Sequence, residues 1–250
     1  MSNLYFITDL DRTIIHAKNK GFKCVEKEGE KEITYMTEDS YKELMKLLSL
    51  EHFKFIPCTM RNIRQTLRVD FIKEYNPQII ICTNGAQIYI DGQLDTEWDK
   101  EVRKLIDKKE VIKDIQYIES LNIDVQEVRN IEDFYITIKC EDVDKAKVAY
   151  EILKDKFAEH IRIMQMGVKV FIINKNIDKL HAVDYIIDKF EIENLFTAGD
   201  SEPDRCFTRR GISILPKHCS FSNENAIVTE KSGIYATDDL IDILKKHIVV

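Results

Sequence analysis

Short apolar runs recur along the chain and alternate with segments whose apolar residues have helical spacing. Residues 4–7, 53–58, 78–82 and 195–198 have the length and apolar character of buried strands. After Thr37, which is a favourable N-cap, the apolar residues recur at the intervals of an amphipathic helix. Buried strands that alternate with helices predict an α/β fold with a parallel sheet covered on both faces.

Three further segments complete the expected first third of the chain. Residues 22–26 and 32–36, joined by a Lys-Glu-Gly-Glu stretch, predict a short hairpin, and residues 62–75 predict a helix.

Between residues 87 and 174 the pattern changes. A hairpin at 87–94 is followed by a charged helical segment at 98–119. Next come strands at 123–129, 133–139, 160–166 and 168–173, with a helix at 142–157. Strand pairs joined by helices predict a small α+β domain. We therefore expect a discontinuous core domain, 1–86 and 175–250, with an inserted domain at 87–174.

Two acids follow the first strand directly. Successive side chains of an extended segment point to opposite faces, so Asp9 and Asp11 project to the same side, roughly 6–7 Å apart. Carboxylates that face one point repel each other unless a cation neutralises them. The pair suits a cation-dependent site in which one acid is nucleophile or ligand and the other shuttles a proton. An Asx turn at the end of a strand is the structural alternative.

Polar residues also follow two of the other strands. Thr59 comes after residues 53–58, and Asp200 and Asp204 come after residues 195–198. If these strands are parallel neighbours, their carboxyl ends share the edge where open α/β sheets build their sites. The hydroxyl group and the four acids would then converge from positions nearly 200 residues apart. Such convergence favours a functional site over an Asx turn.

Four short motifs, in this order, resemble those of the haloacid dehalogenase-like superfamily of phosphatases and phosphotransferases. They are Asp-Leu-Asp-Arg-Thr at 9–13, Thr-Met-Arg at 59–61, Lys-Leu-His-Ala-Val at 179–183 and Gly-Asp-Ser-Glu-Pro-Asp at 199–204. The strand that ends in Asn-Gly-Ala at 84–86 is similar to one in the subgroup with a large cap between the second and third motifs. The resemblance covers most of the chain. It implies a Rossmann-like core and an α+β cap like that of sucrose-phosphate phosphatases, phosphomannomutases and Cof-like phosphatases.

The resemblance implies a catalytic role for four of the matched residues. Asp9 would attack the phosphoryl group and form an aspartyl-phosphate. Asp11 would protonate the leaving alcohol and then activate water. Thr59 and Lys179 would contact the phosphoryl oxygens.

The resemblance also implies a magnesium ion. Asp9, the backbone carbonyl of Asp11 and Asp200 would hold it, with Asp204 as a ligand or as an acid behind the ligands. A few carboxylates, completed by waters and a phosphoryl oxygen, are the usual surroundings of Mg²⁺ in proteins.

Three residues depart from the usual motifs. Arg12 stands where Gly is usual, Leu180 replaces the Gly after the lysine, and Pro203 replaces the Asn before the last acid. The Pro203 change removes an amide near the metal, and such groups matter roughly 10–100-fold for metal affinity or activity. The acids, Thr59 and Lys179 are all present, so the implied chemistry is retained.

Two residues near the motifs are candidates for substrate binding. Arg12 would either reach a substrate oxygen or form a salt bridge with neighbouring acids. Asn84 would either line the cleft under the cap or make the turn before Gly85.

Three more candidates lie on one predicted strand of the cap. Phe134, Ile136 and Ile138 form an apolar face that should pack on the cap helices. The alternate residues on the opposite face are Tyr135, Thr137 and Lys139. A lysine with two hydroxyl groups suits a hydroxylated anionic ligand, and a solvated strand face is the alternative.

Composition and charge limit the class of partner. The net charge is −7, whereas a nucleic-acid protein needs a basic face. No apolar run approaches the roughly 18 residues of a membrane span, and no export signal is recognisable. The six cysteines include no Cys-x-x-Cys pair. We expect a cytoplasmic protein with a small phosphorylated substrate, and with neither nucleic acid nor membrane as partner; the oligomeric state stays open.

These features predict a Mg²⁺-dependent phosphatase of a small phosphorylated metabolite, such as a sugar phosphate. A phosphosugar mutase or another phosphotransferase shares every motif and is the first alternative. A non-catalytic, phosphoryl-binding regulatory protein is the second. A dehalogenase is disfavoured, because that chemistry does not use the second acid of the Asp-x-Asp pair.

Overall fold

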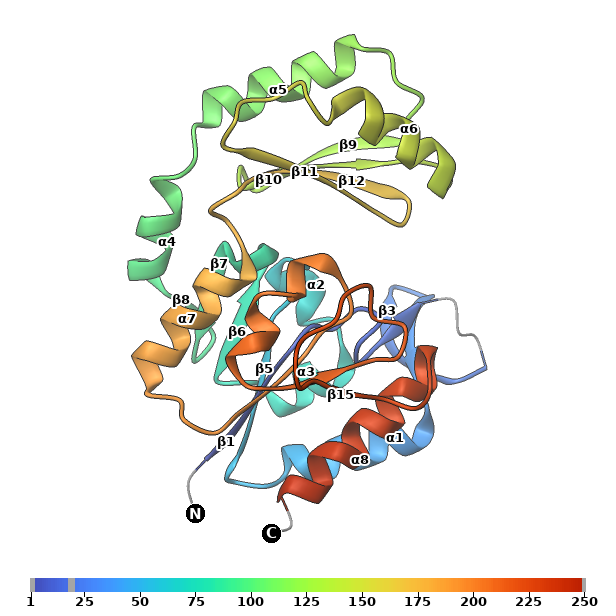
Figure 1. Cartoon of the computed structure of the whole chain (residues 1–250), viewed down its shortest axis with the longest axis vertical. Coiled ribbons are helices and arrows are strands. Elements are labelled where there is room, and N and C mark those ends of the chain that lie inside the picture. The colour runs from blue at the N-terminus through green and yellow to red at the C-terminus, as the bar shows by residue number, and fades with distance from the viewer. Residues whose placement is uncertain (1–2, 18–20, 249–250) are drawn as a thin grey trace. The chain divides into compact units, whose positions relative to one another are not determined.

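The computed structural model describes residues 3–17 and 21–248, which form two compact units. One unit holds the chain up to Asp95 and from Lys179 onward, and the other holds Thr96–Asp178 (Figure 1). In this division the hairpin at 87–94 lies in the first unit, whereas the sequence pattern placed it in the inserted domain.

A parallel sheet forms the centre of the first unit. Its strand order is β15-β14-β13-β1-β5, and every neighbouring pair is parallel. The strands are β15 (Ile227–Val228), β14 (Ile212–Leu215), β13 (Leu195–Ala198), β1 (Leu4–Thr8) and β5 (Phe53–Pro57). An isolated parallel bridge between Cys58 and Ile81 adds β6 (Ile79–Cys82) beyond β5. The predicted parallel neighbours of the first strand are therefore confirmed.

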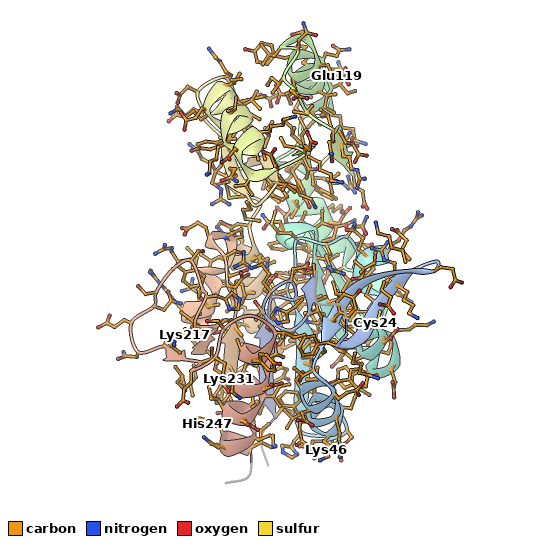
Figure 2. The ribbon with its side chains drawn as sticks, turned by 90° about the vertical axis from the view of Figure 1, so that its right-hand side faces the viewer. Cys24, Lys46, Glu119, Lys217, Lys231 and His247 are labelled. Carbon is orange, nitrogen blue, oxygen red and sulfur yellow. The ribbon has the colours of Figure 1, made fainter. Side chains whose placement is uncertain are left out.

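Helices and an apolar core support this sheet. The helices α1 (Glu38–Leu48) and α8 (Ala236–Ile248) pack side by side, and their last turns are marked by Lys46 and His247 in Figure 2. Aromatic rings of the strands and leucines of these helices share one buried cluster, which includes Phe6, Phe53, Phe55, Leu44, Leu47, Leu240 and Leu244. The α7 helix (Lys179–Phe190) packs against β6 and the short helix η1 (Thr83–Gly85). The predicted N-cap is confirmed, since Thr37 accepts a hydrogen bond from the backbone of Ser40.

Two of the expected long helices are interrupted. The segment 62–75 contains α2 (Ile63–Thr66) and α3 (Asp70–Tyr75), because Val69 is extended and forms a bridge with Glu26. The segment 98–119 contains α4 (Thr96–Arg103) and α5 (Lys108–Ser120), because Asp107 caps a new helix.

Two small antiparallel sheets of three strands each complete the described part of the first unit. The first comprises β2 (His16–Ala17), β3 (Lys23–Glu28) and β4 (Lys31–Met36), and its pairing is irregular around Glu26. The second joins β6 to β7 (Gln87–Ile90) and β8 (Gln93–Leu94).

The second unit is an antiparallel sheet with helices on one face. Its order is β11-β12-β10-β9, with β9 at Glu127–Ile131, β10 at Tyr135–Lys139, β11 at Ile161–Met166 and β12 at Lys169–Asn174. Ile136 and Ile138 pack against α5 and α6 (Val143–Leu153), as predicted. Phe134 is also buried, but it precedes the strand and packs under the guanidinium of Arg103. Among the described helices, none is long and apolar enough to cross a bilayer.

Candidate active site

Three strand ends bring acids and a hydroxyl group to the carboxyl edge of the sheet. Asp9 follows β1, Thr59 follows β5 and Asp200 follows β13, the two strands that flank β1. Backbone hydrogen bonds fix the first two, from Asp9 N to the oxygen of Ala198 at 2.9 Å and from Thr59 N to that of Ile81 at 2.9 Å. The three strand ends therefore share one edge of the sheet, as predicted.

Three buried carboxylates form a compact group at this edge. Asp9, Asp200 and Asp204 each offer an oxygen that lies within 4.8 Å of the others. Among the described residues, this group does not include the side chain of Asp11. The group contains the residues predicted to hold a metal through their side chains.

Lys179 places an ammonium group between two of these acids. It is the first residue of α7, and its Nζ lies 2.6 Å from Asp9 Oδ1 and 2.7 Å from Asp204 Oδ1. Only 1% of its side chain is exposed. Burial lowers the pKa of Lys179, but the carboxylates of Asp204 and Asp9 raise it by more, so the lysine stays charged.

Burial and mutual repulsion raise the pKa of Asp9 and Asp200, which favours the neutral forms of these acids. Burial raises the pKa of Asp9 well above its ordinary value; Lys179 lowers it, and Asp204 and Asp200 raise it further. Burial, with the charge of Asp204, also raises the pKa of Asp200 to about 6. Acids in this condition favour a bound cation, because the cation stabilises their ionised forms.

Asp204 is held by hydrogen bonds from the neighbouring residues Asp200 and Ser201. Its Oδ2 accepts hydrogen bonds from Asp200 N at 3.1 Å, from Ser201 N at 3.0 Å and from the Ser201 hydroxyl at 2.9 Å. Gly199 permits this approach, since a Cβ atom there would lie 2.4 Å from the Cβ of Asp204. Pro203 stands in the short helix η2 (Glu202–Asp204), so it replaces the usual Asn without breaking the turn. Both predicted roles of Asp204, a metal ligand or an acid behind the ligands, stay predictions.

Arg12 forms the salt bridge that was one of its two predicted roles. Its Nε lies 3.1 Å from Asp200 Oδ2, although that oxygen accepts no well-aligned hydrogen bond from any described residue. The backbone of Arg12 has φ +66°, in the left-handed region that glycine adopts most easily. Its carbonyl accepts a hydrogen bond of 2.8 Å from His218 Nε2, which holds this conformation.

Asp11 lies half-exposed and is held by an arginine. Arg61 Nε donates to Asp11 Oδ2 and Arg61 Nη2 donates to Asp11 Oδ1, each at 2.7 Å. The same guanidinium donates through Nη1 to the buried carboxylate of Glu26 at 2.8 Å. Neither partner of Asp11 and Arg61 was predicted from the sequence. The position of Arg61 two residues after Thr59 was the available signal, whereas no local pattern indicated Glu26.

Thr59 and Asn84 are both fully buried. The hydroxyl of Thr59 accepts a hydrogen bond of 3.2 Å from Arg61 N, and its carbonyl accepts one of 3.0 Å from Asn84 N. Asn84 has φ +58°, so it makes the left-handed turn that was one of its two predicted roles. Its predicted contact with substrate stays a prediction.

The three candidates on the cap strand differ in exposure. Tyr135 is only 4% exposed, and its ring lies 6.4 Å from that of Phe171. Thr137 is half-buried and Lys139 is exposed. The predicted role of these residues in substrate binding stays a prediction.

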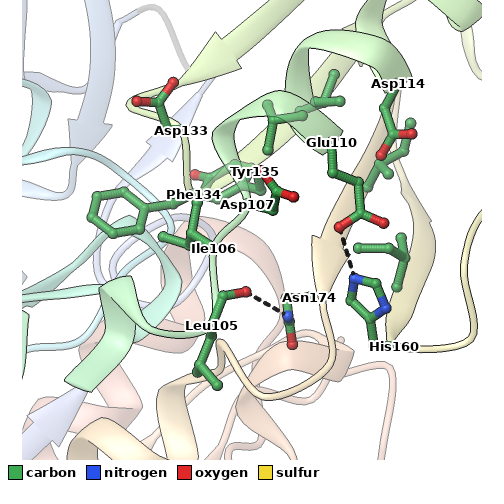
Figure 3. A pocket seen from close by; sticks show the side chains of 14 residues that line it. Leu105, Ile106, Asp107, Glu110, Asp114, Asp133, Phe134, Tyr135, His160 and Asn174 are labelled. Atoms are coloured by element: carbon green, nitrogen blue, oxygen red, sulfur yellow. Dashed lines mark hydrogen bonds and ion pairs between the residues drawn. The ribbon is translucent and has the colours of Figure 1, made fainter. Parts of the chain in front are cut away.

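Two cavities lie away from the clustered acids. A cavity of about 30 Å³ in the second unit has room for about one water molecule (Figure 3). On its wall, the carboxylate of Glu110 lies 3.1 Å from His160 Nε2, and Asn174 donates to the carbonyl of Leu105 at 2.9 Å. A wider hollow of about 600 Å³ lies at the amino ends of β1 and β13, opposite the edge that carries the acids. As the described residues define them, neither cavity is lined by an acid of the cluster.

Comparisons with known proteins agree with this geometry. The family model described as sucrose-6F-phosphate phosphohydrolase matches residues 2–214. The chain belongs to this family. Membership in the sucrose-6F-phosphate phosphohydrolase family confirms the predicted haloacid dehalogenase-like superfamily, and with it a phosphoric monoester hydrolase. Among curated proteins, a sequence comparison finds no match.

Solved structures share the fold over nearly the whole chain. The sucrose-phosphatase from Synechocystis sp. PCC6803, in complex with sucrose and phosphate, is 14% identical with a TM-score of 0.66, over 98% of this chain and 99% of that one. TM0651 from Thermotoga maritima is 16% identical with a TM-score of 0.69, over 98% and 97% of the chains. The HAD subclass IIB sugar phosphatase BT4131 is 14% identical with a TM-score of 0.65, over 99% and 100%. The predicted α/β core with an inserted α+β domain is therefore confirmed as a fold.

Proposed function

We propose that the protein is a Mg²⁺-dependent phosphatase that hydrolyses a small phosphorylated metabolite through an aspartyl-phosphate. One observation carries the proposal: a buried ammonium group, Lys179, holds the carboxylate of Asp9 beside two further acids. A nucleophile oriented in this way has its charge balanced before substrate arrives. The lysine then remains available to the phosphoryl oxygens in the transition state.

The reaction divides into two transfers. An oxygen of Asp9 attacks phosphorus, the bond from phosphorus to the leaving oxygen breaks, and Asp11 gives that oxygen a proton. A water oxygen then attacks phosphorus, the bond to Asp9 breaks, and Asp11 takes the proton of the water. Thr59 and Lys179 contact the phosphoryl oxygens during both transfers.

The acids fit a small, hard divalent cation. Carboxylate oxygens are the ligands that Mg²⁺ prefers, and Asp200 Oδ2 is buried with no hydrogen bond from the described residues. Asp9, Asp200 and the backbone carbonyl of Asp11 would hold the ion, and Asp204 would orient them. When bound, the ion supplies positive charge that offsets the approaching phosphate dianion.

The relatives of the chain support a substrate class. The matching family model and the structures of the Synechocystis enzyme and BT4131 describe phosphatases of sucrose phosphate or of sugars. A sugar phosphate or a similar hydroxylated phosphate monoester is therefore the proposed substrate. A cytoplasmic location stays a prediction.

A screen of phosphorylated sugars, nucleotides and cofactors tests the proposal. With Mg²⁺ we expect release of inorganic phosphate from at least one sugar phosphate, and in excess chelator we expect none. Full activity in chelator would reject the metal assignment. Transfer of phosphate to a second hydroxyl group, without release, would identify a phosphosugar mutase instead.

A further inference from the structure

Glu26 is a fully buried carboxylate on β3, in the hairpin that follows the first motif. Its Oε2 accepts from Arg61 Nη1 at 2.8 Å and from the Thr34 hydroxyl at 3.1 Å. Its Oε1 accepts from Arg68 Nη2 at 3.0 Å and from Arg68 Nε at 3.1 Å. Removing a charge from water is costly, so a carboxylate is tolerated in the interior only when its partners offset that cost.

A β-bulge directs this carboxylate inward. Cys24 pairs with Tyr35 and Glu26 with Thr34, so Val25 is an extra residue on its strand. Such a bulge re-aims the next side chain, and both Val25 and Glu26 are buried. The bridge from Glu26 to Val69 then holds the segment between α2 and α3 against the hairpin. These contacts are independent of Asp11.

Glu26 holds Nη1 of Arg61 at 2.8 Å, together with a longer contact of 3.4 Å from Nη1 to the carbonyl of Gln65. A guanidinium is planar, so fixing Nη1 also fixes the directions in which Nε and Nη2 donate. These two groups meet the two oxygens of Asp11, each at 2.7 Å. Arg61 is 11% exposed and Asp11 is 50% exposed, so the ordered partner in this pair is the arginine.

We infer that Glu26 is a positioning residue for Asp11 and acts through Arg61. This inference rests on the proposed function, because it assigns Glu26 to the acid and base steps that we propose for Asp11. Glu26 does not touch the reacting atoms. It sets the direction from which the carboxylate of Asp11 reaches the leaving oxygen and, later, the attacking water.

Glu26→Gln tests the inference, with Glu28→Gln as the matched control. Both changes replace a carboxylate by an amide on β3. Glu28 is 63% exposed and pairs only with Arg68 among the ion pairs of the described residues. Because a misplaced catalytic group costs on the order of 100-fold in rate, we expect Glu26→Gln to lower kcat for an alkyl phosphate by about 10–100-fold. Glu28→Gln should stay within about twofold of wild type, since exposed ion pairs contribute little.

The time course with p-nitrophenyl phosphate separates positioning from a general loss of structure. Nitrophenolate leaves without needing a proton, so the first transfer should be nearly normal in Glu26→Gln. Hydrolysis of the aspartyl-phosphate still needs Asp11, so a burst of about one nitrophenolate per active site should precede a slow steady state. A fall of burst and steady state together, or wild-type kinetics in the folded variant, would overturn the inference.

If Glu26→Gln does not fold, the double variant Glu26→Gln with Arg61→Gln, compared with Arg61→Gln alone, offers a second test. Removing both partners avoids an unpaired buried charge, so Glu26→Gln with Arg61→Gln should fold more readily than Glu26→Gln alone. If Glu26 acts through Arg61, the double variant should have the kcat of Arg61→Gln. A further loss of tenfold or more in the double variant would show an independent structural role and contradict the inference.

Different outcomes would contradict the proposed function and the role of Glu26. If wild type releases no phosphate from any monoester, the proposed function is wrong. If wild type is active and Asp9→Asn is inactive, but Glu26→Gln behaves like Glu28→Gln, only the role of Glu26 is wrong.

Discussion

At the scale of single residues, the site depends on one ammonium group shared between two acids. Lys179 contacts Asp9 on one side and Asp204 on the other, and all three side chains are buried. Even with Arg12 paired to Asp200, two positive charges face a group of three acids. The remaining negative charge is what we expect a divalent cation to offset.

Asp204→Asn should therefore lower both the free energy of unfolding and the rate of turnover. The amide cannot fully replace a carboxylate that accepts from Lys179 and from the Asp200 and Ser201 backbone. Breaking one side of a buried ion pair costs about 3–5 kcal/mol, and we expect a loss of that order in urea unfolding. Asp188→Asn, an exposed change on α7, is the control. Equal stabilities of the two variants would contradict a supporting role for Asp204.

At the scale of elements, the strands and the convergence of their polar ends follow from the sequence, and the contacts between distant elements do not. Apolar runs located β1, β5 and β13, because a buried parallel strand must be almost wholly apolar. The break at Val69 was missed, because it depends on a bridge to Glu26, 43 residues earlier. A separation of 50 residues likewise hid the hydrogen bonds from Arg61 to Asp11.

On the α5 helix, Asp114 has a raised pKa whose effect on stability can be measured. Burial, with the nearby charge of Glu110, raises the pKa of Asp114 from 3.8 to about 6. The folded state therefore binds the proton more tightly than the unfolded state, so the free energy of unfolding falls as pH rises from about 4 to 6.

Asp114→Asn removes this charge and should stabilise the protein only at higher pH. Allowing for screening by solvent, we expect a gain of about 1 kcal/mol in the free energy of unfolding at pH 7.5, which vanishes towards pH 3.8. Urea unfolding across this range measures it. Glu119→Gln, on the exposed side of α5 (Figure 2), should change little at any pH. A gain that is independent of pH would refute the explanation by charge.

At the scale of the whole molecule, the unit that holds the clustered acids is joined to a second unit with polar side chains of its own. Lys139 is exposed on β10, where it pairs across the strands with Glu127 and Lys169. The sequence could place this lysine on a strand face. It could not say what the face binds, because such contacts depend on the substrate.

Lys139→Ala tests whether this face binds the substrate. We expect a higher KM for the sugar phosphate identified in the screen and an unchanged KM for p-nitrophenyl phosphate, which has no sugar to contact. Lys147→Ala, an exposed change on α6, is the control. Equal effects on both substrates would remove Lys139 from the proposed substrate site.

The most direct test of the central claim is to locate the phosphoryl group on the enzyme. Wild type mixed with substrate and Mg²⁺, quenched in acid within one turnover and analysed by mass spectrometry, should carry phosphate on Asp9. Asp9→Asn should fold normally, carry no phosphate and turn over no substrate, because the amide keeps the volume and removes the nucleophile. Phosphate on another residue, or turnover by Asp9→Asn near the wild-type rate, would contradict the aspartyl-phosphate mechanism.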